Sequence, residues 1–253
     1  MNGTPTLELR GISKSFGSVR ALVDCDFEVQ DGEVMALVGD NGAGKSTLIK
    51  CAAGIYSIDS GEIYFEGSLV HLRGPKDAAR LGIEVVYQDL ALADNLDVVQ
   101  NMYLGRELHD RLQLLDEPQM RKRTEEVMAD LGVTTLRSVR QHVETLSGGQ
   151  RQSVAVARAV MWNSRVVVLD EPTAALGVVQ TEQVLTLVKR LAAQGLAVVL
   201  VSHNLNDVFQ VADRITVLHL GQNVGVFERA ATSQEEIVLA ITTGTRAQAT
   251  AEP

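Results

Sequence analysis

An eight-residue segment, residues 39–46, constrains this chain more than any other and reads Gly-Asp-Asn-Gly-Ala-Gly-Lys-Ser. It follows an apolar run at residues 34–38 and opens a stretch with helical character at residues 45–53. A glycine-rich loop between a strand and a helix turns its backbone N–H groups toward phosphate oxygens, and the helix N-terminus adds positive potential. The pattern therefore predicts a phosphate loop within an α/β fold.

The residues that end this loop suit the phosphates of ATP and a Mg²⁺ ion. We expect the Lys45 ammonium to reach the β- and γ-phosphates, the Ser46 hydroxyl to bind Mg²⁺ and Thr47 to contact the α-phosphate. Glycines within the loop allow its backbone to curl around the phosphates. The expected nucleotide-binding residues here are Gly39, Asp40, Asn41, Gly42, Ala43, Gly44, Lys45, Ser46 and Thr47.

Two carboxylates follow a second apolar run, where residues 166–171 read Val-Val-Val-Leu-Asp-Glu. Many strands end in solvated acids, so the pattern alone is ambiguous. Beside a phosphate loop it gains meaning, because ATP hydrolysis requires a metal ligand and a group that activates water. We expect Asp170 to hold Mg²⁺ and Glu171 to orient the attacking water or take its proton.

Strand-like and helical stretches alternate along the chain, which is typical of an α/β fold. Several apolar runs are continuous, as in strands that are buried on both faces of a parallel sheet. Strands are expected at residues 7–12, 34–38, 63–65, 83–87, 166–169, 197–201 and 215–218. Helices are expected at residues 45–53, 118–131, 178–193 and 233–243. The segment 89–162 has no strong strand pattern, so we expect an inserted helical subdomain.

Composition excludes several other classes of protein. Apolar residues make up 45% of the 253 residues, enough for a full core, and the net charge of -9 disfavours binding to nucleic acid. Cys25 and Cys51 are expected to be small buried hydrophobes. Residues 1–10 lack a signal pattern, and no apolar run approaches the roughly 20 residues of a membrane helix. We therefore expect a cytoplasmic chain with any membrane role supplied by a partner, and a frayed tail at residues 245–253.

A third motif, Leu-Ser-Gly-Gly-Gln, occupies residues 146–150 and ends 20 residues before Asp170. Ser147 is expected to cap the next helix, and the two glycines allow its backbone to approach an anion. An ordinary helix start is the alternative for this motif alone. In combination with the phosphate loop and the two acids, the motif resembles the ATP-binding cassette family, and the resemblance covers residues 7–244.

The resemblance implies the architecture of a P-loop NTPase cassette. Its parts would be an α/β RecA-like core sheet, an antiparallel β subdomain and an inserted helical subdomain. Residues 1–253 would then form a single ATP-binding domain. The catalytic core would comprise residues 1–88 and 163–232, the helical subdomain residues 89–162, and a C-terminal helix and tail residues 233–253.

Three single residues also match the family in order. Phe16 stands where the family has an aromatic residue that stacks on adenine, and Gln88 stands where a glutamine contacts Mg²⁺ or the water and faces the membrane partner. His203 stands at the histidine that contacts the γ-phosphate. Each has a structural alternative: a core phenylalanine, a polar strand end and a satisfied loop histidine. The signature residues expected to contact ATP are Ser147, Gly148, Gly149 and Gln150.

The family also implies a mechanism. Two copies pair head to tail as a homodimer, so that the phosphate loop of one faces the signature residues of the other across ATP. Hydrolysis then opens the pair and moves the coupling helices of an integral-membrane permease. The chain would lie peripherally on the cytoplasmic face of the inner membrane, with residues 88–104 as its docking surface.

One position departs from the family pattern. After residues 170–173 the family reads Ser-Ala-Leu-Asp, whereas this chain reads Ala-Ala-Leu-Gly, so that Gly177 replaces the usual aspartate. We expect this change to affect the contact across the dimer and the coupling between sites. Because Glu171 and His203 are retained, hydrolysis is still expected.

Local strings resemble the bacterial monosaccharide importers, the ribose, xylose and fructose group. They lie within residues 88–107, 174–178, 201–209 and 235–244. Many ATPases of this group carry two fused cassettes, whereas this chain carries one, as the fructose-type members do. The resemblance implies import of a monosaccharide, with an external sugar-binding protein as an indirect partner. Selectivity for the sugar is expected to lie in the binding protein and in the permease, which are other chains.

Four alternatives remain within the same superfamily. DNA-repair and chromosome cassettes carry long coiled coils, but only 102 positions separate Lys45 from Ser147. Translation-associated members hold two cassettes and a basic linker. An exporter or lipoprotein-release ATPase keeps the same chemistry and is opposed only by the string after Gln88 and by the C-terminal stretch. An inactive regulatory cassette is supported by Gly177 alone.

Overall fold

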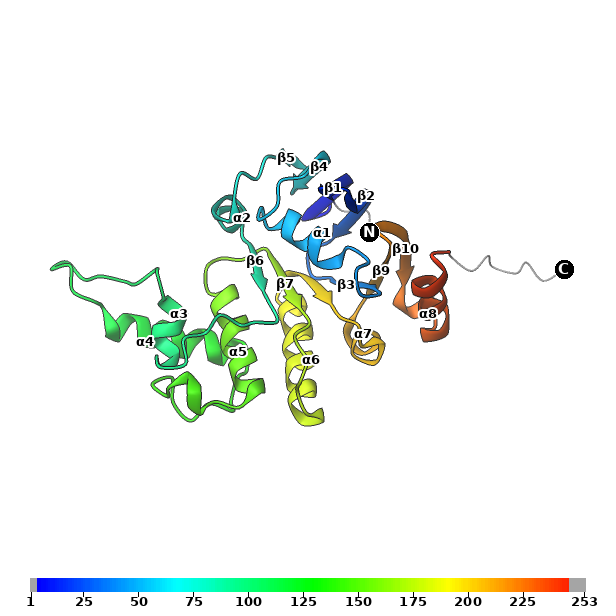
Figure 1. The fold of residues 1–253 in the computed structure, drawn as a ribbon. Helices are drawn as coiled ribbons and strands as arrows, with labels where there is room; N and C mark the ends of the chain where they lie inside the picture. The colour runs from blue at the N-terminus through cyan, green and yellow to red at the C-terminus, as the bar shows by residue number, and fades with distance from the viewer. Residues whose placement is uncertain (1–3, 246–253) are drawn as a thin grey trace.

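A six-stranded sheet forms the centre of the protein (Figure 1). The computed structural model describes residues 4–245. Neighbouring strands of this sheet run parallel, except that β10 pairs antiparallel with β9 at one edge. In spatial order the strands are β10 (Gln222–Glu228), β9 (Arg214–His219), β3 (Val34–Gly39), β8 (Ala197–Val201), β7 (Val166–Asp170) and β6 (Ile83–Val86).

Both faces of this sheet are buried, which explains why its strands are continuous apolar runs. Every residue of β3 and of β8 is buried. Because side chains alternate along a strand, Met35 and Leu37 of β3 enter one core, while Ala36 and Val38 enter another. The first core contains helix α1 (Lys45–Ala52), and the second contains α5 (Gly148–Val160) and α6 (Val178–Ala193).

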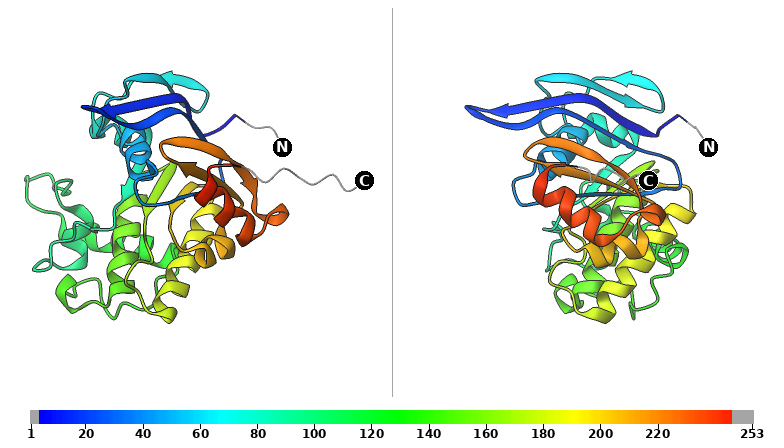
Figure 2. Two further views of the ribbon diagram at one scale, coloured as in Figure 1. Left: turned by 45° about the vertical axis from the view of Figure 1, so that its right-hand side comes forward. Right: turned by 90° about the vertical axis from the view of Figure 1, so that its right-hand side faces the viewer.

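A second, antiparallel sheet covers the α1 side of the molecule. Figure 2 shows it as the blue and cyan strands above α1. Leu7, Leu9 and Phe27 of this sheet pack in one core with Leu48 of α1. In spatial order its strands are β2 (Val19–Val29), β1 (Leu7–Phe16), β4 (Ser60–Phe65) and β5 (Ser68–Val70). The antiparallel β part of the expected fold is therefore present.

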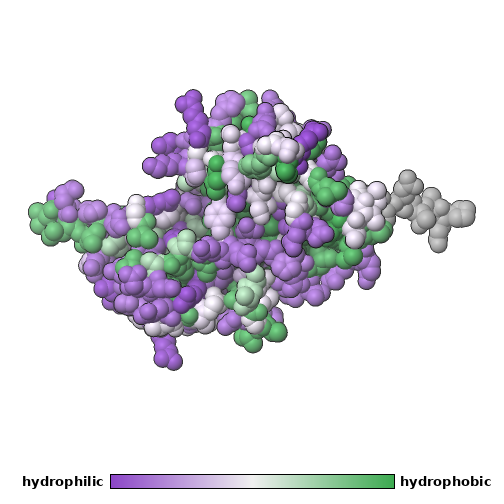
Figure 3. Space-filling model, in the orientation of Figure 1, coloured by the Kyte–Doolittle hydropathy of each residue, from purple (hydrophilic) through white to green (hydrophobic). Residues whose placement is uncertain are grey.

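The stretch between β6 and β7 contains helices and loops and no strand. It contains α3 (Val98–Tyr103), α4 (Glu117–Asp130), the 3₁₀ turn Val143–Thr145 and α5. The loop between α3 and α4 projects from the body of the protein, and apolar side chains gather at its tip (Figure 3). This tip contains Leu112, Leu114 and Leu115, which are 77%, 63% and 52% exposed.

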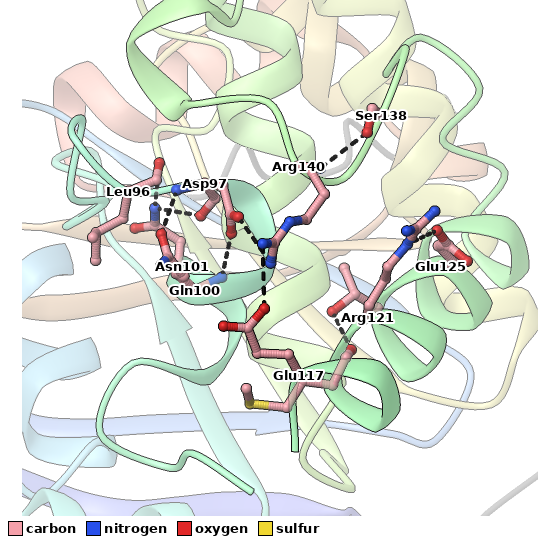
Figure 4. Close-up of polar contacts among 11 residues, drawn as sticks. Leu96, Asp97, Gln100, Asn101, Glu117, Arg121, Glu125, Ser138 and Arg140 are labelled. Carbon is pink, nitrogen blue, oxygen red and sulfur yellow. Dashed lines mark hydrogen bonds and ion pairs between the residues drawn. The ribbon is translucent and has the colours of Figure 1, made fainter. Parts of the chain in front are cut away.

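Polar contacts fix the start of α3 and tie it to the rest of the helical stretch (Figure 4). Asn101 is fully buried, and its amide nitrogen donates to the carbonyl oxygens of Leu96 (3.3 Å) and Asp97 (3.0 Å). The guanidinium of Arg140 lies 3.3 Å from the Asp97 carboxylate and 3.3 Å from that of Glu117 at the start of α4. A buried amide needs such partners, so these bonds give the loop before α3 one conformation.

The remaining helices are short and lie at the surface of the two cores. They are α2 (Pro75–Leu81), α7 (Leu205–Val211), α8 (Gln234–Thr243) and the 3₁₀ turn Arg229–Ala231. Of the helices in residues 4–245, none is long and apolar enough to cross a bilayer. Both cysteines are buried as expected, and the Cys25 thiol donates to the carbonyl oxygen of Gly221 at 2.9 Å.

Several helices and strands begin or end at other residues than the sequence predicts. Helix α4 begins at Glu117 rather than Pro118, and α1 ends at Ala52, two residues before Gly54. Strand β1 extends four residues past its expected end at Ile12 because β2 pairs along its length. Strands β2, β5 and β10 and helices α2, α3 and α7 were not predicted individually. The expected tail lies outside the described residues except for Thr245.

Candidate functional site

The carboxyl ends of β3, β6, β7 and β8 meet at one edge of the central sheet. In open α/β sheets this edge is where ligands bind. A hollow of about 460 Å³ opens there. It is lined by Val19, Arg20, Ala21, Asn41, Gly42, Ala43, Gly44, Lys45, Ser46, Thr47, Gln88, Asp170, Glu171 and His203.

The end of β3 and the loop that follows it have a backbone that only glycine fits at two positions. Gly39 has φ 154°, and a Cβ there would lie 2.4 Å from the carbonyl oxygen of Leu218. Gly44 has φ 104°, and a Cβ there would lie 2.8 Å from the carbonyl oxygen of Ala21. The loop is therefore pressed against β9 on one side and β2 on the other. This close packing holds its backbone around the hollow.

Lys45 begins helix α1 and folds back across the loop. Its ammonium donates to the carbonyl oxygens of Gly39 (2.7 Å) and Asp40 (3.0 Å), and the residue is 9% exposed. Burial lowers the pKa of Lys45, and the nearby carboxylates, Glu171 first, oppose that shift. The hollow therefore contains a largely buried cation held close to the loop backbone.

Asp170 and Glu171 stand at the end of β7. Burial and then the charge of Glu171 raise the pKa of Asp170. Glu171 has a left-handed backbone with φ 52°, and its N–H donates to the carbonyl oxygen of Val201 at 2.9 Å. Non-glycine residues in this conformation are uncommon and cluster at functional sites. The turn aims the two carboxylates into the hollow.

His203 comes from the segment after β8 and meets Glu171. Its Nδ1 atom lies 2.8 Å from Oε2 of Glu171. The imidazole is 69% exposed and the glutamate side chain 17% exposed. Gln88, two residues beyond β6, lines the same hollow. The chain thus brings Lys45, Gln88, the acid pair and His203 together from four segments that follow or end strands of the central sheet.

Phe16 lies beside this hollow and is not part of its lining. It ends β1, is 44% exposed and is paired in register with Val19, which does line the hollow. Residues 19–21 of β2 had no motif in the sequence and were missed as site residues. They reach the hollow only because the antiparallel sheet packs over the phosphate loop, a contact that no local pattern reports.

The signature residues 147–150 lie elsewhere on the same chain. Ser147 caps α5 as expected, because its hydroxyl accepts from the N–H of Gln150 at 3.3 Å. Gln150 completes a capping box by accepting from the N–H of Ser147 at 2.8 Å. A Cβ at Gly148 would lie 2.9 Å from Leu176, so this helix start packs against the segment before α6. The structure does not bring Ser147, Gly148, Gly149 or Gln150 into the hollow.

Gly177, the unusual position, precedes α6 as its N-cap. Its φ of −75° is ordinary for any residue, and a Cβ there would lie 3.9 Å from Oε1 of Gln180, an ordinary van der Waals distance. Nothing in the backbone therefore requires glycine. Val178 and Val179 follow it and are 85% and 72% exposed.

Comparison with known proteins gives one family. The ABC transporter family model matches residues 22–174. The fructose import ATP-binding protein FrcA of Rhizobium meliloti is 46% identical over 228 residues, which cover 88% of each chain. The xylose/arabinose import ATP-binding protein XylG of Sulfolobus acidocaldarius is 44% identical over 93% of each chain.

Solved structures agree with this result. An ATP-binding cassette of an ABC transporter in its ADP conformation matches with a TM-score of 0.80 and 26% identity, over 94% of this chain and 95% of that one. A dimeric bacterial ABC transporter cassette matches with a TM-score of 0.75 and 25% identity, over 88% of this chain and 98% of that one.

Proposed function

The chain belongs to the ABC transporter family as an ATP-hydrolysing cassette, and from this premise we propose that it energises the import of a monosaccharide. The convergence of Lys45, Glu171 and His203 on one hollow carries the hydrolytic part of the proposal. Import of a sugar is inferred from the relatives. FrcA and XylG match most of this chain and are import ATP-binding proteins for fructose and for xylose or arabinose.

ATP would lie with its triphosphate in the loop that contains Gly39, Asp40, Asn41, Gly42, Ala43, Gly44, Lys45, Ser46 and Thr47. The loop N–H groups and the buried Lys45 ammonium would bind the phosphate oxygens. Phe16 would stack on adenine from the end of β1, where its ring is 44% exposed.

The oxygens of Ser46, Gln88 and Asp170 would hold Mg²⁺. Hydroxyl, amide and carboxylate oxygens are ligands that Mg²⁺ accepts, and one carboxylate beside substrate phosphates is its usual protein environment. The donor set therefore fits this ion. When bound, it would neutralise charge on the phosphate oxygens.

Glu171 would orient the attacking water and accept its proton as ATP is converted to ADP and phosphate. His203 would hold the Glu171 carboxylate through their 2.8 Å contact and would also contact the γ-phosphate. The left-handed backbone of Glu171 supports this role, because it turns the carboxylate away from the strand and toward the hollow.

A second copy of the chain would complete the site. Ser147, Gly148, Gly149 and Gln150 lie outside the hollow of their own chain, while Ser147 and Gly148 are exposed at the start of α5. A homodimer arranged head to tail would place this helix start, with its positive potential, against the γ-phosphate. The likeness to a dimeric cassette supports this arrangement.

Integral-membrane permease subunits would dock beside the Gln88 loop. A hollow of about 210 Å³ lies there, with Leu104, Arg106 and Trp162 in its wall. Arg158 of α5 donates to the carbonyl oxygens of Leu90 and Ala91, both at 2.8 Å. The docking surface is thus bonded directly to the helix that begins with the signature residues.

We also propose a location, partners and a domain organisation for the chain. The chain would lie on the cytoplasmic face of the inner membrane, with an external sugar-binding protein as an indirect partner and no role for nucleic acid. Residues 1–88 and 163–232 would form its catalytic core, residues 89–162 the helical subdomain that docks the permease, and residues 233–253 a C-terminal helix and tail.

Co-purification tests this assignment. Tagged Glu171→Gln protein, which should retain ATP, would be isolated from gently solubilised native membranes with Mg·ATP, and its partners identified by mass spectrometry. We expect a polytopic permease in near-equal amount, with a sugar-binding protein. Arg106→Glu, in the wall of the hollow beside the Gln88 loop, should reduce recovery of the permease, whereas Arg121→Glu on the exposed face of α4 should not. Ribosomal or DNA-repair proteins without a membrane protein would overturn the importer assignment.

A further inference from the structure

Phe16 is held by a second aromatic ring that no motif singled out. Tyr56 lies in the turn after α1, and its ring centroid is 5.0 Å from that of Phe16 at an interplanar angle of 71°. Edge-to-face pairs of this kind favour one relative orientation of the two rings. Tyr56 is partly buried against the core that contains α1, while Phe16 stays 44% exposed. The exposed ring is therefore oriented by a ring that is itself anchored.

Asp59, three residues further on, holds the backbone next to Phe16. Its carboxylate accepts from the N–H of Ser15 at 2.7 Å and from the ammonium of Lys14 at 2.8 Å. The N–H of Asp59 donates to the carbonyl oxygen of Ser13 at 2.9 Å. The hydrogen bond from Lys14 is the main reason that the pKa of Asp59 lies below its usual value. Asp59 thus holds the last residues of strand β1 in place.

The segment that contains Tyr56 and Asp59 is also bonded, at its start, to α1, the helix that follows the phosphate loop. The N–H groups of Ile55 and Tyr56 both donate to the carbonyl oxygen of Lys50, at 2.8 and 3.1 Å. Lys50 belongs to α1, which begins with Lys45. Residues 55–59, here called the spacer, therefore connect the helix that carries the phosphate-binding lysine to the strand end that carries Phe16.

We propose that the spacer is a positioning element that fixes Phe16 at the distance from the phosphate loop that a nucleoside triphosphate requires. Tyr56 acts on the ring, and Asp59 acts on the backbone of Ser15. This inference rests on the proposed function, in which Phe16 stacks on adenine. A stacking platform contributes most when it is already in place before the ligand binds. The spacer therefore adds to the affinity for a ligand with a base and adds nothing for a bare triphosphate.

Calorimetric titration of the purified full chain carrying Glu171→Gln, which binds ATP without turnover, tests this role with two probes, Mg·ATP and inorganic tripolyphosphate. Tyr56→Leu keeps an apolar side chain and removes the ring, while Tyr56→Phe keeps the ring. We expect Tyr56→Leu to weaken ATP binding by roughly three- to tenfold, the worth of one aromatic pair, with tripolyphosphate binding unchanged. Asp59→Ala should also weaken ATP binding and leave tripolyphosphate binding unchanged, because it frees the backbone next to Phe16. Tyr56→Phe should bind ATP as the parent does.

Phe16→Ala separates failure of the inference from failure of its premise. If Phe16→Ala weakens ATP binding and Tyr56→Leu and Asp59→Ala do not, the spacer has no positioning role and the stacking role stands. If Phe16→Ala leaves ATP binding unchanged, the stacking role is wrong and the inference falls with it. Equal loss of affinity for both probes in the spacer variants also overturns the inference, since it would mean a distorted phosphate loop.

Discussion

Nδ1 of His203 lies 2.8 Å from Oε2 of Glu171, although the two residues are 32 positions apart in the chain. Their contact follows from the sheet, because β7 and β8 are parallel neighbours and Asp170 pairs in register with Val201. Both strands end at the same edge of the sheet. Glu171, the first residue after β7, therefore lies next to His203, the second residue after β8. The pair is therefore held at the ends of two buried strands.

Glu171→Gln should abolish most ATP hydrolysis while leaving ATP binding intact. Glutamine has the same shape and cannot accept a proton, and loss of a general base costs about 10²- to 10⁴-fold in rate. Phosphate release and calorimetric ATP binding would be measured on the same preparation. An activity equal to that of the parent protein would contradict the role assigned to Glu171.

The effects of His203→Ala and Glu171→Gln should not multiply. Residues in direct contact act as a unit, so the double variant should lose far less than the product of the two single losses. The rates of hydrolysis of all four proteins complete the cycle. Fully multiplicative losses would mean that His203 acts on the phosphate independently of Glu171.

Much of the fold was readable because its patterns are local. Strand β8 and helix α6 have the bounds that the apolar run and the helical period predicted. The phosphate loop, the two acids and the Ser147 cap were found because each has a fixed spacing. Burial on both faces of the central sheet made its strands continuous apolar runs, which are the strongest signal in the chain.

The features that were missed depend on packing between distant segments. Strand β2 changes its register with β1 several times, which breaks the alternation that a strand would otherwise show. Residues 19–21 enter the site only through the approach of β2 to Gly44. The pairing of Tyr56 with Phe16 joins residues 40 positions apart, and neither carries a mark in the sequence that predicts the contact.

Gly177→Asp should fold well and alter communication between two copies of the chain. A side chain has room there, and aspartate is a better N-cap than glycine by a few tenths of a kcal/mol. We expect a slightly higher melting temperature and a raised Hill coefficient for ATP hydrolysis, because the change restores the residue that the family carries. Gly177→Ala is the control, since it fills the same space without a charge. An unchanged Hill coefficient in both variants would contradict the coupling role.

Arg214→Met should destabilise the protein by about 3 kcal/mol, because it leaves a nearly buried carboxylate without its cation. Arg214 donates to both carboxylate oxygens of Glu33, at 2.6 and 3.1 Å, and Glu33 is 8% exposed. This hydrogen bonding raises the pKa of Arg214. Urea unfolding measures the free energy.

Arg121→Met is the matched control for this change. Arg121 also pairs with a glutamate, Glu125 at 2.8 Å, but both side chains are half exposed on α4. An exposed pair contributes about 0.5 kcal/mol, so this variant should unfold almost as the parent does. Equal losses in the two variants would show that burial of Glu33 is not the cause.

The thiol of Cys51 should make the protein lose stability in alkaline solution. Burial raises the pKa of this thiol from 9.0 to about 11, because a thiolate in the core is poorly solvated. Below pH 9 the thiol is protonated in both the folded and the unfolded chain and has no effect on the pH dependence. Between pH 9 and 11 the unfolded chain releases the proton and the folded chain keeps it, so stability falls as pH rises.

Urea unfolding of the parent and of Cys51→Ala at pH 8, 9, 10 and 11 isolates this contribution, since the other groups that titrate are common to both. The difference in unfolding free energy should stay constant up to about pH 9 and then shift against the parent by about 2 kcal/mol by pH 11. A difference that is the same at every pH would mean that the folded thiol ionises as an exposed one does, contrary to its burial in α1.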